Sequence, residues 1–213
     1  MLISTDSISL LRLLQIADSA LPIGGSAHSF GLETMAEEGA LTPDTIEDFL
    51  RHHLEEGGRL DAAFVRQAWK TIDHWNLNQE YAARKPARES RDASLKLGRR
   101  FVELFNRLAA TPGGLSILDP GLHYCIAFGA AGALLDIPER LVVLGYLHQS
   151  MAGLISACQR LMPLGQSAAS KILWNLKPAM VRAAQSEEVW CFSPYPELAS
   201  MRHGSLETRL FIS

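Results

Sequence analysis

The chain has 213 residues, enough for one domain with a substantial core or at most two small ones. Hydrophobic residues make up 47% and the formal net charge is −3, which is ordinary for a globular protein and gives no overall basic excess for nucleic acid or anionic lipid. Three cysteines without a C-x-x-C pair, and an N-terminus without a secretory pattern, predict a cytoplasmic protein that lacks a disulfide framework.

The first part of the chain is organised around the stretch L-P-I-G-G-S-A-H-S-F-G-L-E, from Leu21 to Glu33. A short apolar helix, from Ser7 or Ser9 to Ala17, precedes it. Pro22 and the pair Gly24-Gly25 require the backbone to turn. A second helix, Ser29 to Glu38, is then expected to end at Gly39. The stretch is either a corner between two helices or a loop that presents backbone and small side chains to a partner.

Two further helices are predicted next. Thr42, Pro43 and the acidic residues that follow form a helix start, and Gly57-Gly58 predicts the end of that helix. The following helix runs from Leu60 to Trp75. Its apolar spacing predicts that it buries Phe64, Val65, Ala68, Trp69 and Ile72. The polar stretch 76–89 is expected to contain a short helix that breaks near Pro86.

The segment from Ala87 to Ala110 is typical of one long helix, which Thr111-Pro112-Gly113-Gly114 ends. The helix and the residues before it carry a local excess of positive charge. The cations are Arg84, Lys85, Arg88, Arg91, Lys96, Arg99 and Arg100. They form either a solvated helix face or a docking surface for an acidic partner.

An almost wholly apolar region extends from Leu122 to Ala157. Its piece from Leu141 to Gln159 has the length of a membrane span. Because polar residues are spread through this piece and no block of cations flanks it, we expect a helix buried on nearly all sides of a bundle instead. Another helix is predicted from Gly165 to about Gln185.

The last part of the chain differs from the rest. Ser193-Pro194-Tyr195-Pro196 is predicted not to be regular helix, so residues 193–213 are expected to leave the bundle as an extended docking tail. Residues 1–192 then form a single all-α domain, a bundle of about eight to ten helices.

The sequence lacks the usual motifs of an enzyme. It has no P-loop, no dinucleotide-binding glycine motif, no nucleophile elbow and no Glu-x-x-His or His-x-x-x-His pair. The rival interpretation is a helical-bundle enzyme that binds a metal or cofactor through His123, His148 or His203. Tightly held metal or haem in the purified protein would favour that rival.

Three segments in order resemble the UreF family of urease accessory proteins. They are the stretch from Leu21 to Glu33, then R-L-M-P-L-G-Q from Arg160 to Gln166, and the ending S-M-R-H-G-S-L-E-T-R-L-F-I-S. The helix order between them also agrees. Ser26 and His28 stand where the family usually has aromatic residues, and Gly204-Ser205 replace an acidic–polar pair.

The resemblance implies an all-helical adaptor without enzymatic activity or a cofactor of its own. Similar proteins dimerise, bind UreD (also called UreH) and recruit the GTPase UreG, which couples GTP hydrolysis to nickel insertion into apo-urease. A diverged member that serves another nickel or GTPase system is a further alternative. The partner-binding residues implied are Leu21, Pro22, Gly24, Gly25, Ser29, Gly31, Glu33, Arg99, Arg100, Pro163, Gly165, Gln166, Met201, Arg202, His203, Arg209, Leu210 and Phe211.

Overall fold

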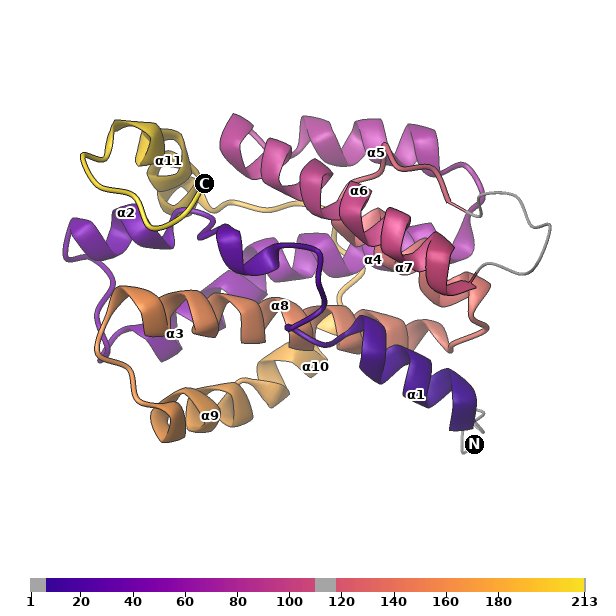
Figure 1. Ribbon diagram of the computed structural model, residues 1–213, viewed down its shortest axis with the longest axis horizontal. Coiled ribbons are helices and arrows are strands. Elements are labelled where there is room, and N and C mark those ends of the chain that lie inside the picture. Colours follow the sequence, from indigo (N-terminus) through magenta and orange to yellow (C-terminus); the bar gives the residue numbers. More distant parts are fainter. Residues whose placement is uncertain (1–6, 110–117, 213) are drawn as a thin grey trace.

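The computed structural model describes residues 7–109 and 118–212, and every regular element within them is helical (Figure 1). The α-helices are α1 (Ser7–Ile16), α2 (Leu32–Glu37), α3 (Ile46–His53), α4 (Arg59–Lys70), α5 (His74–Ala83), α6 (Arg88–Ala109), α7 (Tyr124–Leu134), α8 (Glu139–Leu161), α9 (Gln166–Asn175), α10 (Lys177–Gln185) and α11 (Pro194–Arg202). Three shorter helical turns are η1 (Gly25–Ala27), η2 (Leu54–Gly58) and η3 (His203–Ser205). The predicted all-α class is confirmed. The turn predicted at Thr111–Gly114 lies outside the described residues.

The centre of the bundle is α7, which packs against α4, α6 and α8. Its residues from Tyr124 to Gly132 are all buried. Close approach needs glycine at the crossings, because a Cβ on Gly129 would collide with the Val65 carbonyl oxygen. A Cβ on Gly98 in α6 would collide with the Leu122 carbonyl oxygen in the same way. The small residues of the apolar region therefore let helices pack tightly within one chain.

Among the described residues, α8 is the one helix long and apolar enough to cross a membrane. Half of its most apolar window is buried, against neighbours that include α4, α7 and α10. A helix buried on nearly all sides was expected over these residues, and this is wrong for α8. It is α7 that the other helices surround, while one side of α8 lies near the surface.

The predicted helix end at Gly57-Gly58 is also wrong. Both glycines lie in η2, a π-helical turn that joins α3 to α4 without a break. Gly58 keeps helical dihedral angles and is buried, and η2 packs against α10. Tertiary packing thus overrides the tendency of glycine to end helices.

Two other boundaries differ from the sequence prediction. Helix α4 ends at Lys70, so Ile72 is not buried but 98% exposed, and Asp73 caps the next helix by accepting from the Asn76 amide. The long helix predicted from Gly165 to Gln185 is two helices, which meet at Leu176. Pro178 stands in the first turn of α10, where its missing N–H is tolerated.

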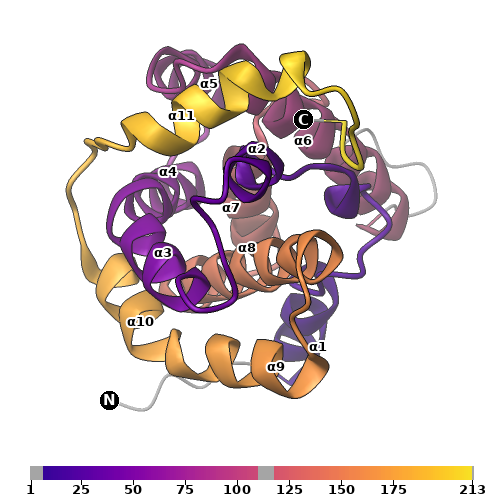
Figure 2. The same ribbon diagram turned by 90° about the vertical axis from the view of Figure 1, so that its left-hand side faces the viewer.

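The C-terminal part is not a free extended tail. Pro194 begins α11 rather than preventing a helix, since a proline in the first turn gives up no helical hydrogen bond. Helix α11 lies over α2 and α6 on the outside of the bundle (Figure 2). Only residues 206–212, after η3, lack helical structure, and they run back along the same end of the molecule.

Candidate partner-binding site

The loop that the sequence singled out passes directly beneath α11. Phe30 and Gly31 both have positive φ, at 52° and 88°. Two reasons require glycine at position 31. The first is its positive φ. The second is space, because a Cβ there would lie 2.7 Å from the Pro196 carbonyl oxygen and 3.1 Å from the Ser200 amide nitrogen. The turn therefore lets the backbone of α11 rest on the backbone of the loop.

Glu33, in the first turn of α2, holds the end of the chain in place. Its side chain is buried, and Oε2 lies 2.7 Å from His203 Nε2, which donates to it. The backbone N–H groups of Leu210 and Phe211 donate to the same carboxylate at 2.5 and 3.2 Å. Three donors from the last eleven residues thus converge on one carboxylate of the loop.

The end of α8 completes this arrangement. The Arg160 guanidinium donates to the Ser26 carbonyl at 2.6 Å and to the Leu210 carbonyl at 3.3 Å, and it stacks 4.2 Å from the centre of the Phe211 ring. The Ile212 N–H donates to the Ala27 carbonyl at 2.8 Å. Residues 21–33, 160–166 and 201–212 therefore meet in one place, which we call the junction.

The residues predicted to bind partners divide by burial. Those that are exposed are Pro22, Arg99, Arg100, Pro163, Gly165, Gln166, Met201, Arg202, Arg209 and Leu210. Those that are partly buried are Leu21, Gly24 and Gly25. Those that are buried are Ser29, Gly31, Glu33, His203 and Phe211. Gly31, Glu33, His203 and Phe211 of the buried group fix the loop and the chain end against each other. The exposed group is accessible to solvent.

The cations of α6 behave in two ways next to the loop. Arg100 lies against Gly24 and donates to the Ile23 carbonyl at 3.4 Å. Arg99 instead pairs with Glu103 at 2.9 Å on another side of the helix. Burial, together with the neighbouring charges of Lys96 and Arg100, lowers the pKa of His28 to about 4. The loop therefore lies in a positive local field.

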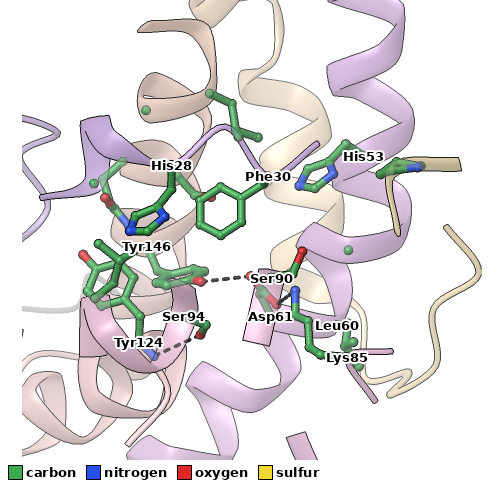
Figure 3. A pocket seen from close by; sticks show the side chains of 18 of the residues that line it. His28, Phe30, His53, Leu60, Asp61, Lys85, Ser90, Ser94, Tyr124 and Tyr146 are labelled. Atoms are coloured by element: carbon green, nitrogen blue, oxygen red, sulfur yellow. Dashed lines mark hydrogen bonds and ion pairs between the residues drawn. The ribbon is translucent and has the colours of Figure 1, made fainter. Parts of the chain in front are cut away.

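A cavity of about 170 Å³ lies beneath the loop, and His28 and Phe30 line it (Figure 3). On its wall the Asp61 carboxylate accepts from the Tyr81 and Tyr146 hydroxyls at 2.7 and 2.9 Å. Lys85 Nζ pairs with the same carboxylate at 3.5 Å.

The groups around Asp61 have shifted pKa values. Burial raises the pKa of both Tyr81 and Tyr146 well above 10, and Asp61 adds to this. Burial alone would lower the pKa of Lys85, but Asp61 and Glu197 raise it more. Around Asp61 the wall thus holds a paired charge and two neutral tyrosines.

The three histidines of the rival interpretation lie apart. His123 is buried at the start of α7 against the Tyr81 ring, His148 lies in α8, and His203 binds Glu33. Among residues 7–109 and 118–212, no three His, Cys, Asp or Glu side chains are grouped closely enough to hold a metal ion. The structure brings none of these histidines into a common site.

Two functional side chains escaped sequence reasoning. Arg160 belongs to the second resembling segment, but nothing in the sequence places it on Ser26 or Phe211. Asp61 stands between the core residues Leu60 and Ala62, and a carboxylate in such a run was the only sign that it has buried partners.

The chain is similar to proteins of one known family. A family model described as UreF matches residues 41–177. The urease accessory protein UreF of Nostoc sp. strain PCC 7120 is 35% identical over 221 aligned residues, which cover 95% of each chain. The proteins of the same name from Trichormus variabilis and Microcystis aeruginosa are 34% and 33% identical, covering 95% and 98% of this chain and 95% and 99% of theirs.

Proposed function

Because the chain belongs to the UreF family of urease accessory proteins, we propose that it is a non-enzymatic adaptor for urease maturation. It binds UreD (UreH) and recruits the GTPase UreG, so that GTP hydrolysis is coupled to nickel insertion into apo-urease. The partners handle nickel and GTP, and this chain needs no cofactor of its own. It works in the cytoplasm, which suits its three free cysteines.

The observation that carries this proposal is the junction. Three segments that resemble the family lie far apart in the sequence, yet they meet in one partly exposed cluster. A cluster needed only for folding would not have to carry large exposed side chains beside it. Met201, Arg209 and Leu210 are all exposed here, and arginine with apolar neighbours is a common composition for an interface centre.

The test is association of the full chain with purified UreD and UreG. Arg209→Ala is expected to weaken association by about 1–3 kcal/mol if the arginine is buried by the partner. Lys171→Ala, an exposed cation on α9 outside the junction, is the matched control. Wild-type protein that binds neither partner would contradict the proposal, and so would equal losses in the two variants.

We further propose that the chain forms a homodimer, as the family resemblance implies. The apolar and small residues between Leu122 and Ala157 do not carry this proposal, because many of them pack inside one chain. Better support comes from α1, whose Leu10, Leu11 and Leu14 are all more than 40% exposed. Light scattering should give twice the chain mass, and Leu11→Glu/Leu14→Glu should give a monomer. Ile72→Glu, at another exposed apolar position, should leave the dimer intact.

A further inference from the structure

Three cations gather around residues 23–28 of the loop. Lys96 and Arg100 reach this loop from α6, and Arg160 reaches it from the end of α8. All three are exposed. Within the part of the chain that the structure describes, none of them forms an ion pair with a carboxylate, and the two arginines contact backbone carbonyls and an aromatic ring.

Helix α6 shows that this arrangement differs from an ordinary charged face. Arg88 and Arg99 each pair with an acid four residues later, Asp92 and Glu103. Lys96 instead has Arg100 four residues later, and like charges at this spacing repel each other. The face toward the loop therefore concentrates positive charge that the isolated chain leaves uncompensated.

The neighbouring groups leave the positive charge of Lys96 and Arg100 open to an acidic ligand. The two charges that act on His28 are both cations, and the lowered pKa keeps its ring neutral at pH 7. Arg100 uses one nitrogen for the Ile23 carbonyl, so the other donors of its planar guanidinium are available on the exposed side. A carboxylate that arrives here would meet charge-assisted donors from both sides of the loop.

Apolar side chains adjoin the cations. Leu210 and Ile212 are 56% and 63% exposed, and both are tied to the loop by backbone contacts through Arg160 and Ala27. Nucleic acid does not call for an apolar rim of this kind, and the net charge of −3 also disfavours it. The neighbouring groups fit a peptide that carries both acidic and apolar side chains.

We propose that residues 23–28, with Lys96, Arg100 and Arg160, form a docking site for an acidic segment of a protein partner. The inference rests on the proposed adaptor function and names the chemistry of one contact. Acid side chains of the partner pair with the three cations, while an apolar side chain covers Leu210 or Ile212. Such a contact speeds association and depends strongly on salt.

A direct test uses a labelled peptide of six glutamates and two leucines, titrated onto the full wild-type chain. The peptide should bind, more weakly as salt rises, and a version with glutamine for glutamate should not bind. Lys96→Glu/Arg100→Glu should weaken binding by at least tenfold, and Lys96→Gln/Arg100→Gln by less. Lys171→Glu/Lys177→Glu makes the same change of charge at exposed cations elsewhere, and should change affinity less than twofold. All variants should have the wild-type melting temperature within a few degrees.

Several outcomes overturn the inference. The first is a wild-type chain that does not bind the peptide. The second is an equal loss of peptide affinity in Lys96→Glu/Arg100→Glu and Lys171→Glu/Lys177→Glu. The third is tighter binding of a single-stranded oligonucleotide of equal charge than of the peptide. The same variants assayed with UreD and UreG separate this inference from the adaptor function. If both partners bind wild type and Lys96→Glu/Arg100→Glu equally well, the adaptor function stands and the acidic docking site is wrong.

Discussion

Two carboxylates, the partly buried Asp61 and the buried Glu33, organise this molecule in different ways. Asp61 accepts from the Tyr81 and Tyr146 hydroxyls and pairs with Lys85, so all its partners are side chains of the bundle. Glu33 accepts from the backbone of Leu210 and Phe211 and from His203, so all its partners lie in the last eleven residues. The first carboxylate joins α4 to α5, to α8 and to Lys85, two residues beyond the end of α5. The second joins the loop to the chain end.

Because their partners lie in different places, Asp61 is expected to stabilise the bundle as a whole, and Glu33 is expected to stabilise the junction. Removing Asp61 leaves the largely buried Lys85 cation and two buried tyrosine hydroxyls inside the bundle without their acceptor. Removing Glu33 leaves backbone amides at the surface end of the chain, which can detach and become solvated. A change at Asp61 should therefore act on the whole fold, while a change at Glu33 should act mainly on residues 203–212.

The largest effect is expected from Asp61→Asn. Lys85 then keeps its charge without a partner while its side chain is only 19% exposed. Breaking a buried pair in this way destabilises a protein by about 3 kcal/mol or more. Chemical denaturation should show this loss in the free energy of unfolding.

Asp61→Asn/Lys85→Met should recover part of that loss, because it removes the unpaired charge as well. Asp48→Asn is a suitable control, since that carboxylate is 80% exposed and its contact with Arg51 is long at 4.0 Å. It should change the free energy of unfolding by less than about 0.5 kcal/mol. A loss at Asp61 no larger than at Asp48 would show that the cavity wall is solvated.

Glu33→Ala should have a smaller and more local effect. It removes the acceptor of three hydrogen bonds, which predicts a loss of about 2 kcal/mol because the freed amides are resolvated once the chain end detaches. Trypsin should then cleave after Arg209 and Arg202 faster than in the wild type, while the helical circular dichroism changes little. A large loss of the helical circular dichroism signal would show instead that the whole fold depends on Glu33, as is expected for Asp61.

The pH dependence of the free energy of unfolding tests the region around Asp61 through His123, a buried neighbour. Burial lowers the pKa of His123 to about 4, with Lys85 and Arg91 lowering it and Asp61 raising it. The unfolded pKa is near 6.5, so the unfolded chain binds more protons between pH 4 and 6.5. The free energy of unfolding therefore falls as the pH falls through this window, by at most about 1.4 kcal/mol per pH unit for one group.

His123→Phe keeps a ring against Tyr81 and removes the titrating group. The variant should lose stability less steeply between pH 6.5 and pH 4 than the wild type does. Part of the slope should remain, because burial lowers the pKa of His28 and His53 to about 4 as well. An unchanged slope in urea titrations across this range would mean that His123 is protonated equally in both states.

The contrast also explains how far the sequence could predict the structure. Features encoded within a few residues were predicted well, such as the long helix α6 and the glycine that ends the Ser29–Glu38 segment, where Gly39 has φ of 70°. The predicted end at Gly57-Gly58 failed because packing of η2 against α10 decides that position. Pro194 was misread because proline suits the first turn of a helix as well as a break.

The candidate site was predictable only in part. Resemblance marked the three segments, but no local pattern relates Glu33 to an amide 177 residues later. The sequence also does not show which residues of the chain end are buried. His203 and Phe211 were therefore expected to face a partner, although they are 1% and 5% exposed. The partners of Asp61 lie 20 and 85 residues away, beyond the reach of helical periodicity.

The smallest effect is expected where the junction meets solvent. Arg202 Nη2 lies 3.1 Å from Glu38 Oε2, but the two side chains are 50% and 36% exposed. Exposed pairs of this kind contribute little to stability, so Arg202→Ala and Glu38→Ala should each change the free energy of unfolding by about 0.5 kcal/mol or less. A double-mutant cycle in urea denaturation should give a coupling energy of similar size.

The same cycle measured on association with UreD or UreG tests whether Arg202 faces a partner. Arg202→Ala should then weaken association more than it weakens folding, because a partner that covers the guanidinium removes it from water. If the two losses are equal and small, Arg202 is an ordinary surface residue, and the binding face is confined to Met201, Arg209 and Leu210.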